Sequence, residues 1–358
     1  MYVPALGDYR VKVIIPLAGE GTRMRPHTHT KPKPLIEFAG KSCLSHILDE
    51  LKVFDEQQKV RLANHQKASP ITGIVFITGR LKEKIEEFVT KNYSFKSFFV
   101  YQQVRDGSAG AIKLAEPFID EPVFIVNIDT LFETDLNIIN DLKEDEGGII
   151  WAKEVENYQS FGVCVLGKDG YIQKIVEKPK EPISKLANIG MYYVKDYKMM
   201  FEGIKYLYDN NLSMKGEFYL VHALTYMMDH GVKIIYGPIE GWYDTGMPET
   251  FLESHRAILE KHNHLAIKGE NSIIIPPVHI ADDVKIVNSI IGPFVSISHK
   301  SEITNSIVRD SVIGRESKIS GLTLEKSIIG DNVEICDNAK QLNIGDHSTL
   351  MLGEKKVE

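Results

Sequence analysis

The stretch from Leu17 to Leu35, LAGEGTRMRPHTHTKPKPL, combines residue types that can bind a polyphosphate. Glycines lack a Cβ atom, so their backbone N–H groups can come close to an anion, while a hydroxyl group and fixed positive charges add further contacts. Three prolines restrict the backbone, so we expect a stiff, extended loop and not the start of a helix. The candidate nucleotide-binding and catalytic residues of this loop are Leu17, Gly19, Gly21, Thr22, Arg23 and Lys33.

A buried strand is predicted immediately before this loop, because Val11–Pro16 is rich in β-branched residues. The chemistry is therefore expected at the carboxyl end of a strand. Two other phosphate-binding motifs fail: a dinucleotide fingerprint needs glycine where Met24 stands, and a P-loop ending in Gly40-Lys41-Ser42 needs glycine where Leu35 stands. A glycine turn with solvated basic residues is the simplest alternative.

Gln102 is the candidate for recognising a nucleotide base, since it lies near the end of the predicted strand Phe98–Gln103. A glutamine amide offers both a donor and an acceptor, so it can pair with the imide edge of thymine or uracil. Gly107 follows shortly after and would allow close approach of the backbone to a nucleotide. A solvent-exposed glutamine without a ligand is the alternative.

Two aspartates are candidate metal ligands. Asp129 follows the apolar run that starts at Pro122, and Asp244 lies in the glycine-bracketed turn Gly241–Gly246. An unpaired carboxylate at the end of a buried strand is costly, and two carboxylates from separate strand ends can hold one Mg²⁺ together with phosphate oxygens. Alternatively, Asp129 caps the segment that follows it and Asp244 belongs to a packing corner.

The opening loop follows the pattern G-x-G-T-R-x-x-P-x-T-x-x-x-P-K-P-L and resembles the signature of the sugar-1-phosphate nucleotidylyltransferases. The resemblance extends from about Val11 to Leu259 and is closest to the glucose-1-phosphate thymidylyltransferase and uridylyltransferase branch. It implies that Asp129 and Asp244 hold Mg²⁺. It also implies sugar-phosphate contacts, for which Glu177 would supply a hydroxyl acceptor and Lys178 a cation; this set is Gly162, Glu177, Lys178, Asn188 and Gly190.

Two positions depart from the family pattern. Ile128 stands where the family usually has glycine, which bears on the backbone geometry beside Asp129. His222 stands where an aspartate is common. Any positioning role of that aspartate is therefore absent or performed differently in this chain.

Alternating strands and helices predict an α/β fold with a Rossmann-like, mostly parallel sheet. We place a nucleotidyltransferase catalytic domain at residues 1–265 and a second domain at 266–358, and residues 55–70 receive no role beyond a helix extension or a surface insertion. The elements expected are helices over Cys43–Phe54, Lys82–Thr90, Lys215–His230 and Glu249–His262, strands over Ile71–Thr78 and Phe98–Gln103, and short strands between Gly147 and Val176.

The C-terminal region has isoleucines at six-residue steps, as in Ile291, Ile297 and Ile303, and the tetrad Ser-x-Ile-Gly recurs. Hexapeptide repeats predict a parallel β-helix, and these resemble the left-handed β-helix tails of ADP-glucose-type pyrophosphorylases and acyltransferases. Subunit contacts in a homo-oligomer are the expected role. Acetyl transfer with His279 or His299 as the base is the alternative.

The composition is that of an ordinary globular protein. The 358-residue chain has a formal net charge of −7, so it lacks the basic surface that nucleic-acid binding needs. Its three cysteines show no metal-ligand spacing, and no run of eighteen apolar residues or signal-like N-terminus is visible. We expect a cytoplasmic protein without nucleic-acid or membrane partners.

Together these features predict nucleotidyl transfer from a nucleoside triphosphate, with dTTP or UTP favoured, to a sugar 1-phosphate, with glucose 1-phosphate favoured. The alternatives are an ADP-glucose-type or other sugar nucleotidyltransferase, a non-catalytic regulatory subunit that binds a sugar nucleotide, and a bifunctional enzyme with an acetyltransferase tail. Positioning and charge neutralisation would carry the catalysis. The catalytic candidates are Arg23, Lys33, Asp129 and Lys178.

Overall fold

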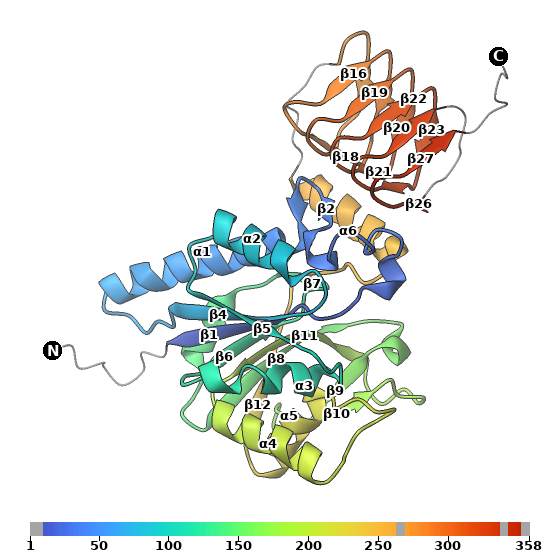
Figure 1. Cartoon of the computed structure of the whole chain (residues 1–358). Helices are drawn as coiled ribbons and strands as arrows, with labels where there is room; N and C mark the ends of the chain where they lie inside the picture. The colour runs from blue at the N-terminus through green and yellow to red at the C-terminus, as the bar shows by residue number, and fades with distance from the viewer. Residues whose placement is uncertain (1–9, 263–268, 337–342, 352–358) are drawn as a thin grey trace. The chain divides into compact units, whose positions relative to one another are not determined.

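The computed structural model describes residues 10–262, 269–336 and 343–351, which fold as two compact units (Figure 1). The first unit contains the chain up to Gly19 together with Ile47–Trp242, and the second contains Glu20–His46 together with the chain from Tyr243 onward. The second unit therefore joins two segments that are far apart in the sequence. The predicted domain boundary between residues 265 and 266 lies outside the described residues.

The main sheet of the first unit has the strand order β10-β9-β11-β6-β1-β4-β5, with β8 and β12 continuing from β11. β1 (Val11–Pro16) lies between β4 (Ile71–Thr78) and β6 (Val123–Val126), and both pairs are parallel. β11 (Leu186–Val194) pairs antiparallel with β6, so the sheet is mixed. β1 and β4 have the predicted bounds. The remaining strands of this unit are β5 (Ser97–Tyr101), β7 (Thr130–Glu133), β8 (Glu146–Glu154), β9 (Gly162–Leu166), β10 (Ile172–Glu177) and β12 (Lys233–Gly237).

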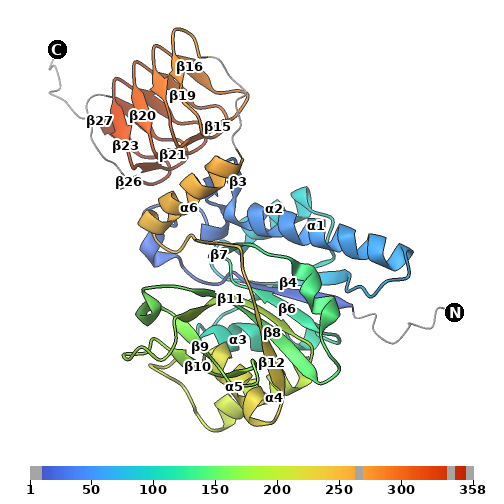
Figure 2. The same cartoon turned by 180° about the vertical axis from the view of Figure 1, so that it is seen from behind.

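Helices cover both faces of this sheet (Figures 1 and 2). α1 (Cys43–Ala63) and α2 (Lys82–Asn92) lie on one face, and α3 (Ser108–Lys113), α4 (Tyr197–Asp209) and α5 (Leu220–Asp229) lie on the other. The second face is held by one apolar cluster that includes Ile14 and Val75 of the sheet and Ile112, Ile204 and Leu224 of the helices. Burying each of these side chains contributes about 1.5–3 kcal/mol. None of the helices among the described residues has the length and apolar run that a membrane crossing requires.

α1 extends beyond its predicted end and gives the polar stretch 55–70 a structural role. Gln58 on the extension is fully buried, and its Oε1 accepts a hydrogen bond from the backbone N–H of Ser69 at 2.9 Å. One turn earlier, Asp55 Oδ1 accepts from the N–H of Ile71 at 2.8 Å, where β4 begins. These polar side chains therefore connect the end of α1 to the start of β4.

The predicted helix over residues 215–230 was placed too early. α5 begins at Leu220, so Glu217 lies before the helix and not in its first turn. Lys215 and Gly216 have φ values of 54° and 81°, which a right-handed helix does not accept. This left-handed pair makes a turn in which Glu217 bridges back to Met214.

The second unit consists of the loop segment 20–46, helix α6 (Pro248–Lys261) and three sheets of short parallel strands. Ile286, Ile303, Ile319 and Ile335 stand in register on successive coils and belong to a single apolar core. This arrangement is consistent with the predicted left-handed β-helix. Its strands are β14 (Ile273–Ile274), β15 (Val278–Ile280), β16 (Lys285–Val287), β17 (Ile290–Ile291), β18 (Val295–Ile297), β19 (Glu302–Thr304), β20 (Ile307–Arg309), β21 (Ser311–Ile313), β22 (Lys318–Ser320), β23 (Thr323–Glu325), β24 (Ile328–Ile329), β25 (Glu334–Cys336), β26 (Asn343–Ile344) and β27 (Thr349–Met351).

Candidate functional site

The candidate nucleotide-binding residues of the first unit lie after the carboxyl ends of β1 and β5. The backbone N–H of Leu17 bonds to Ile77 O at 2.7 Å, which places it at the end of β1. A Cβ atom on Gly19 would meet no other atom within 4 Å, so packing inside the protein does not require glycine there. Gln102 is buried, with its N–H bonded to Thr78 O at 2.8 Å, so it is not the exposed side chain of the alternative interpretation.

Gly107 has a reason to be glycine that does not involve a ligand. Its φ is 107°, and a Cβ atom there would come within 2.3 Å of Phe218 O. Phe218 O accepts the backbone N–H of Ala109 at 2.9 Å, so the close approach joins α3 to the segment that precedes α5. The sequence does not distinguish this internal contact from an approach of the backbone to a nucleotide.

Asp129 lies in the turn between β6 and β7, half-buried. The turn is closed by the N–H of Thr130, which donates to Asn127 O at 3.1 Å, and is joined to β11 by the Asn127 N–H, which donates to Gly190 O at 3.0 Å. Ile128 is not among the residues with positive φ. Position 128 therefore does not require glycine. The backbone beside Asp129 is ordinary even though the family usually has glycine there.

Four of the predicted sugar-phosphate residues are placed by β9, β10 and β11. Gly162 and Glu177 face each other across β9 and β10. Asn188 and Gly190 lie at an irregularity of β11, where Asn188 Oδ1 accepts the Gly190 N–H at 2.9 Å. Gly190 has a φ of 79°, and a Cβ atom there would come within 2.4 Å of Asn127 Nδ2, so only glycine fits.

Tyr192 links these residues to Asp129. Its hydroxyl accepts a hydrogen bond from Asn188 Nδ2 at 2.6 Å. Burial raises the pKa of Tyr192, and the carboxylates of Glu177 and Asp129 act in the same direction. The two carboxylates therefore lie near the same phenol. Sequence reasoning missed Tyr192, which lies four residues after Asn188, beyond the irregularity of β11.

Lys178 is exposed directly after β10. It adopts a left-handed conformation with a φ of 46°, and its N–H bonds to Phe161 O at 3.0 Å. Its Nζ is 3.9 Å from Glu177 Oε1. An exposed cation beside a half-buried carboxylate is the combination expected for a sugar phosphate, with the cation able to turn toward the phosphate.

His222, the second departure from the family pattern, lies on α5 and is half-buried. Burial lowers the pKa of this histidine, and the negative charge of Glu177 opposes that effect. The histidine is therefore close enough to Glu177 to sense its charge. His222 therefore lies near Glu177 as a neutral side chain, whereas an aspartate at this position would carry a negative charge.

The second unit carries the cations of the opening loop. Gly21 has a φ of 59°, and a Cβ atom there would come within 2.9 Å of the Thr28 side chain. One turn of 3₁₀ helix follows at Thr22–Met24, in which Met24 is fully buried while Thr22 and Arg23 are exposed. Lys33, by contrast, is buried.

Asp244 also belongs to the second unit, at the end of β13 (Gly241–Asp244). Its Oδ1 accepts the Gly246 N–H at 2.7 Å, and its backbone oxygen accepts from Ser254 Oγ of α6 at 2.8 Å. The carboxylate is thus oriented by its own turn. No group of three potential metal-ligating side chains occurs among the described residues. Two aspartates fit Mg²⁺ when phosphate oxygens complete its coordination.

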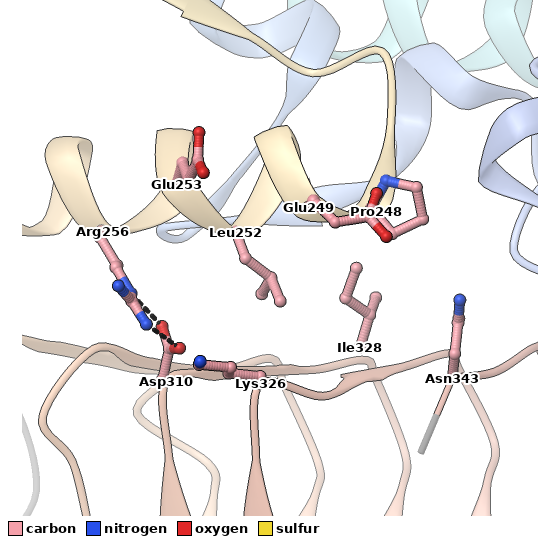
Figure 3. Close-up of a pocket in the computed structure, with 9 residues that line it drawn as sticks. All are labelled: Pro248, Glu249, Leu252, Glu253, Arg256, Asp310, Lys326, Ile328 and Asn343. Carbon is pink, nitrogen blue, oxygen red and sulfur yellow. Dashed lines mark hydrogen bonds and ion pairs between the residues drawn. The ribbon is translucent and has the colours of Figure 1, made fainter. Parts of the chain in front are cut away.

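A separate cavity of about 550 Å³ lies in the second unit, between α6 and the β-helix (Figure 3). Arg256 of α6 and Asp310 of the β-helix form a two-pronged ion pair at one end, with Arg256 Nε 2.5 Å from Asp310 Oδ1. Leu252 and Ile328 point toward each other further along. None of the predicted site residues lines this cavity.

The chain resembles nucleotidyl-transferring proteins in three comparisons. The sequence model of the nucleotidyl transferase family matches residues 12–261. The bifunctional protein GlmU of Methanocaldococcus jannaschii is 33% identical over 266 residues, which are 73% of this chain and 58% of that protein. A glucose-1-phosphate thymidylyltransferase of Streptomyces antibioticus is 29% identical over 377 residues, covering 95% of this chain and 99% of that protein.

Solved structures show the same fold. A UDP-glucose pyrophosphorylase complexed with UDP-glucose superposes with a TM-score of 0.58 at 24% identity, covering 70% of this chain and 99% of that chain. The match to the thymidylyltransferase includes the C-terminal region, whereas the match to GlmU spans little more than half of GlmU.

Proposed function

Because the chain belongs to the nucleotidyl transferase family, we propose that it transfers the nucleotidyl group of dTTP or UTP to glucose 1-phosphate and releases pyrophosphate. Substrates of the family are a nucleoside triphosphate and a sugar 1-phosphate. The observation that supports the sugar half most directly is the gathering of Glu177, Asn188 and Asp129 around Tyr192. Buried Gln102 supports a pyrimidine base, since an amide can bond to both groups of an imide edge.

In this reaction an oxygen of the sugar phosphate attacks the α-phosphorus in line, a P–O bond to that oxygen forms, and the bond to pyrophosphate breaks. No covalent enzyme intermediate is needed, so alignment and charge neutralisation supply the rate. Arg23 neutralises the charge that develops on pyrophosphate. Lys33 and Lys178 hold the α-phosphate and the sugar phosphate.

Enzymes of this family generally use a divalent metal ion. In our proposal Asp129 and Asp244 hold Mg²⁺, and the chemistry it supplies is neutralisation of phosphate charge. The two carboxylates fit this task because they are hard oxygen ligands and because Asp244 is oriented by the Gly246 N–H.

The test is pyrophosphate release with Mg²⁺ and glucose 1-phosphate, run in parallel with dTTP, UTP, ATP, CTP and GTP. Release with dTTP or UTP is expected, and the ratio of the two release rates would identify the preferred nucleotide. Release with ATP alone would contradict the assignment of Gln102. If none of the five nucleotides gave pyrophosphate release, the proposed substrate pair would be contradicted, and another sugar phosphate or a regulatory subunit would be favoured.

Acetyl transfer is the second candidate, since the similar GlmU of Methanocaldococcus jannaschii is named a bifunctional protein. The structure offers one argument against His279 as the base. A Cβ atom on Gly40 would come within 2.0 Å of the His279 ring, so this histidine packs directly on the backbone of residue 40. His299 pairs with Asp283 at 2.9 Å and is exposed. Consumption of acetyl-CoA would support acetyl transfer.

A further inference from the structure

The segment 20–46, which we call the cationic segment, has little secondary structure of its own. It contains two single turns of 3₁₀ helix, a pair of two-residue strands, β2 (Glu37–Phe38) and β3 (Lys41–Ser42), and the first turn of α1. Such a segment does not fix its own conformation, because each strand or turn contributes few hydrogen bonds. Contacts with other parts of the second unit therefore help to hold it.

Three of these contacts come from one row of residues on the β-helix, in addition to others such as the hydrogen bond from the Ala39 N–H to Ser296 Oγ at 2.9 Å. Arg315, Asp331 and Asp346 each follow the glycine that ends an Ile-Gly step, on three successive coils. Arg315 bonds to both carboxylate oxygens of Glu37, at 3.0 and 3.1 Å from Nε. Asp331 pairs with Lys31, and Asp346 accepts a hydrogen bond from Thr30.

The two aspartates are themselves held by the coils. Asp331 Oδ1 accepts the backbone N–H of Arg315 at 3.0 Å, which leaves Oδ2 to face Lys31. Asp346 repeats this arrangement one coil later: Oδ1 accepts the N–H of Asp331 at 2.7 Å, and Oδ2 faces Thr30. Each aspartate thus connects the coil before it to the cationic segment.

Burial makes the Lys31–Asp331 pair more than a surface ion pair. The two side chains are only 18% and 17% exposed, so water screens their attraction less than it does for a pair at the surface. Beside it, His27 is buried and its ring bonds to Asn343. Removing one charge of such a pair leaves the other poorly solvated, so the segment would move to restore hydration.

We propose that Arg315, Asp331 and Asp346 are positioning residues, which hold the cationic segment so that Lys33 and Arg23 are aligned for the phosphates. This inference rests on the proposed function for the roles of these two cations. Lys31 is two residues from Lys33, so a shift of the pair displaces the buried lysine directly. The β-helix of this chain thus serves the transfer reaction without touching substrate.

The test reverses the charges of the buried pair in the full chain. Asp331→Lys and Lys31→Asp are each expected to lower kcat/KM for the nucleotide about tenfold, since a displacement of about 1 Å can cost up to a hundredfold. The KM for the sugar phosphate should not change. The double variant should recover part of the loss, because it restores an attractive pair but not the hydrogen bond that Asp331 Oδ1 accepts from the Arg315 N–H.

Glu302→Lys is the matched control, as it reverses one charge of the Lys285–Glu302 pair on neighbouring coils, 2.7 Å apart and away from the cationic segment. It should leave kcat/KM unchanged. Lys31→Gln is a milder second variant that leaves the coils intact. Equal losses in the control, or no recovery in the double variant, would overturn the proposal.

Amide hydrogen exchange separates this proposal from the proposed function. Residues 20–46 should exchange faster in Asp331→Lys than in Glu302→Lys, whatever the activity. Equal exchange in the two variants would overturn the positioning role. If the wild-type chain released no pyrophosphate with any nucleotide, the proposed function would be wrong, and the exchange rates would still decide whether this row holds the segment.

Discussion

Gly162 and Glu177 lie directly opposite each other on β9 and β10, and a Cβ atom at position 162 would stand 2.7 Å from Glu177 Oε2. The missing side chain therefore makes room for the carboxylate. A Gly162→Ala substitution must push the carboxylate away, because Cβ atoms do not approach an oxygen this closely.

Gly162→Ala should raise the KM for the sugar phosphate about tenfold, because the substrate would lose one hydrogen bond to a charged group. The KM for the nucleotide should stay as it is. Ser160→Ala, at an exposed position two residues away, serves as the control. An unchanged KM for the sugar phosphate would mean that Glu177 does not contact the sugar.

Arg23 and Arg25 provide a matched pair on the same loop, since both are exposed. Arg25 is paired with Glu20 at 3.0 Å. Arg23→Ala should lower kcat on the order of a hundredfold, as the loss of an oxyanion donor does. Arg25→Ala should have a small effect. Equal rates for the two variants, measured by pyrophosphate release, would remove Arg23 from the mechanism.

The metal assignment predicts a shift in the Mg²⁺ requirement. Asp129→Asn and Asp244→Asn should each raise the Mg²⁺ concentration for half-maximal activity at least about tenfold, the loss that follows even when an outer partner of a metal ligand is removed. Asp209→Asn, at an exposed site on α4, is the control. A Mg²⁺ titration that superposes on the wild-type curve for either variant would exclude that aspartate as a ligand.

His255 predicts a dependence of stability on pH. It is fully buried on α6, with Nε2 2.7 Å from Ser296 Oγ, and burial lowers its pKa to about 3, with the neighbouring Arg256 and His279 side chains adding to the effect. Below pH 6.5 the unfolded chain binds a proton that the folded chain does not. The free energy of unfolding should therefore fall by about 1.4 kcal/mol per pH unit between pH 6.5 and 3 from this group.

Denaturant unfolding at several pH values checks this contribution. His255→Gln should lose the corresponding part of the slope, whatever its stability at pH 7, while His230→Gln, at an exposed position, should keep it. A slope that is the same in His255→Gln and in the wild type would contradict the assignment.

The sequence predicted the position of elements in which one class of residue recurs in a regular pattern. β1 and β4 are runs of β-branched residues on a buried sheet, and the β-helix has isoleucines at fixed steps, so their positions follow from local pattern. The end of α1 was missed because its buried face uses Gln58, which a search for apolar periodicity does not detect.

The site could be predicted only where a residue type is rare in its context. Asp129 stands out after an apolar strand, whereas Lys31 looks like any surface lysine until Asp331 is brought beside it. Thr30 and Asp346 are 316 residues apart, and no local pattern connects them. Tyr192 was missed because a buried tyrosine is ordinary in a core, and its importance arises from the carboxylates around it.

The most direct test of nucleotidyl transfer follows the label from two forms of one nucleotide. With glucose 1-phosphate and Mg²⁺, radioactive phosphorus at the α-position of dTTP or UTP should appear in the nucleotide sugar, and label at the γ-position should appear only in pyrophosphate. Label moving from the γ-position to the sugar would mean phosphoryl transfer and would contradict the proposed reaction.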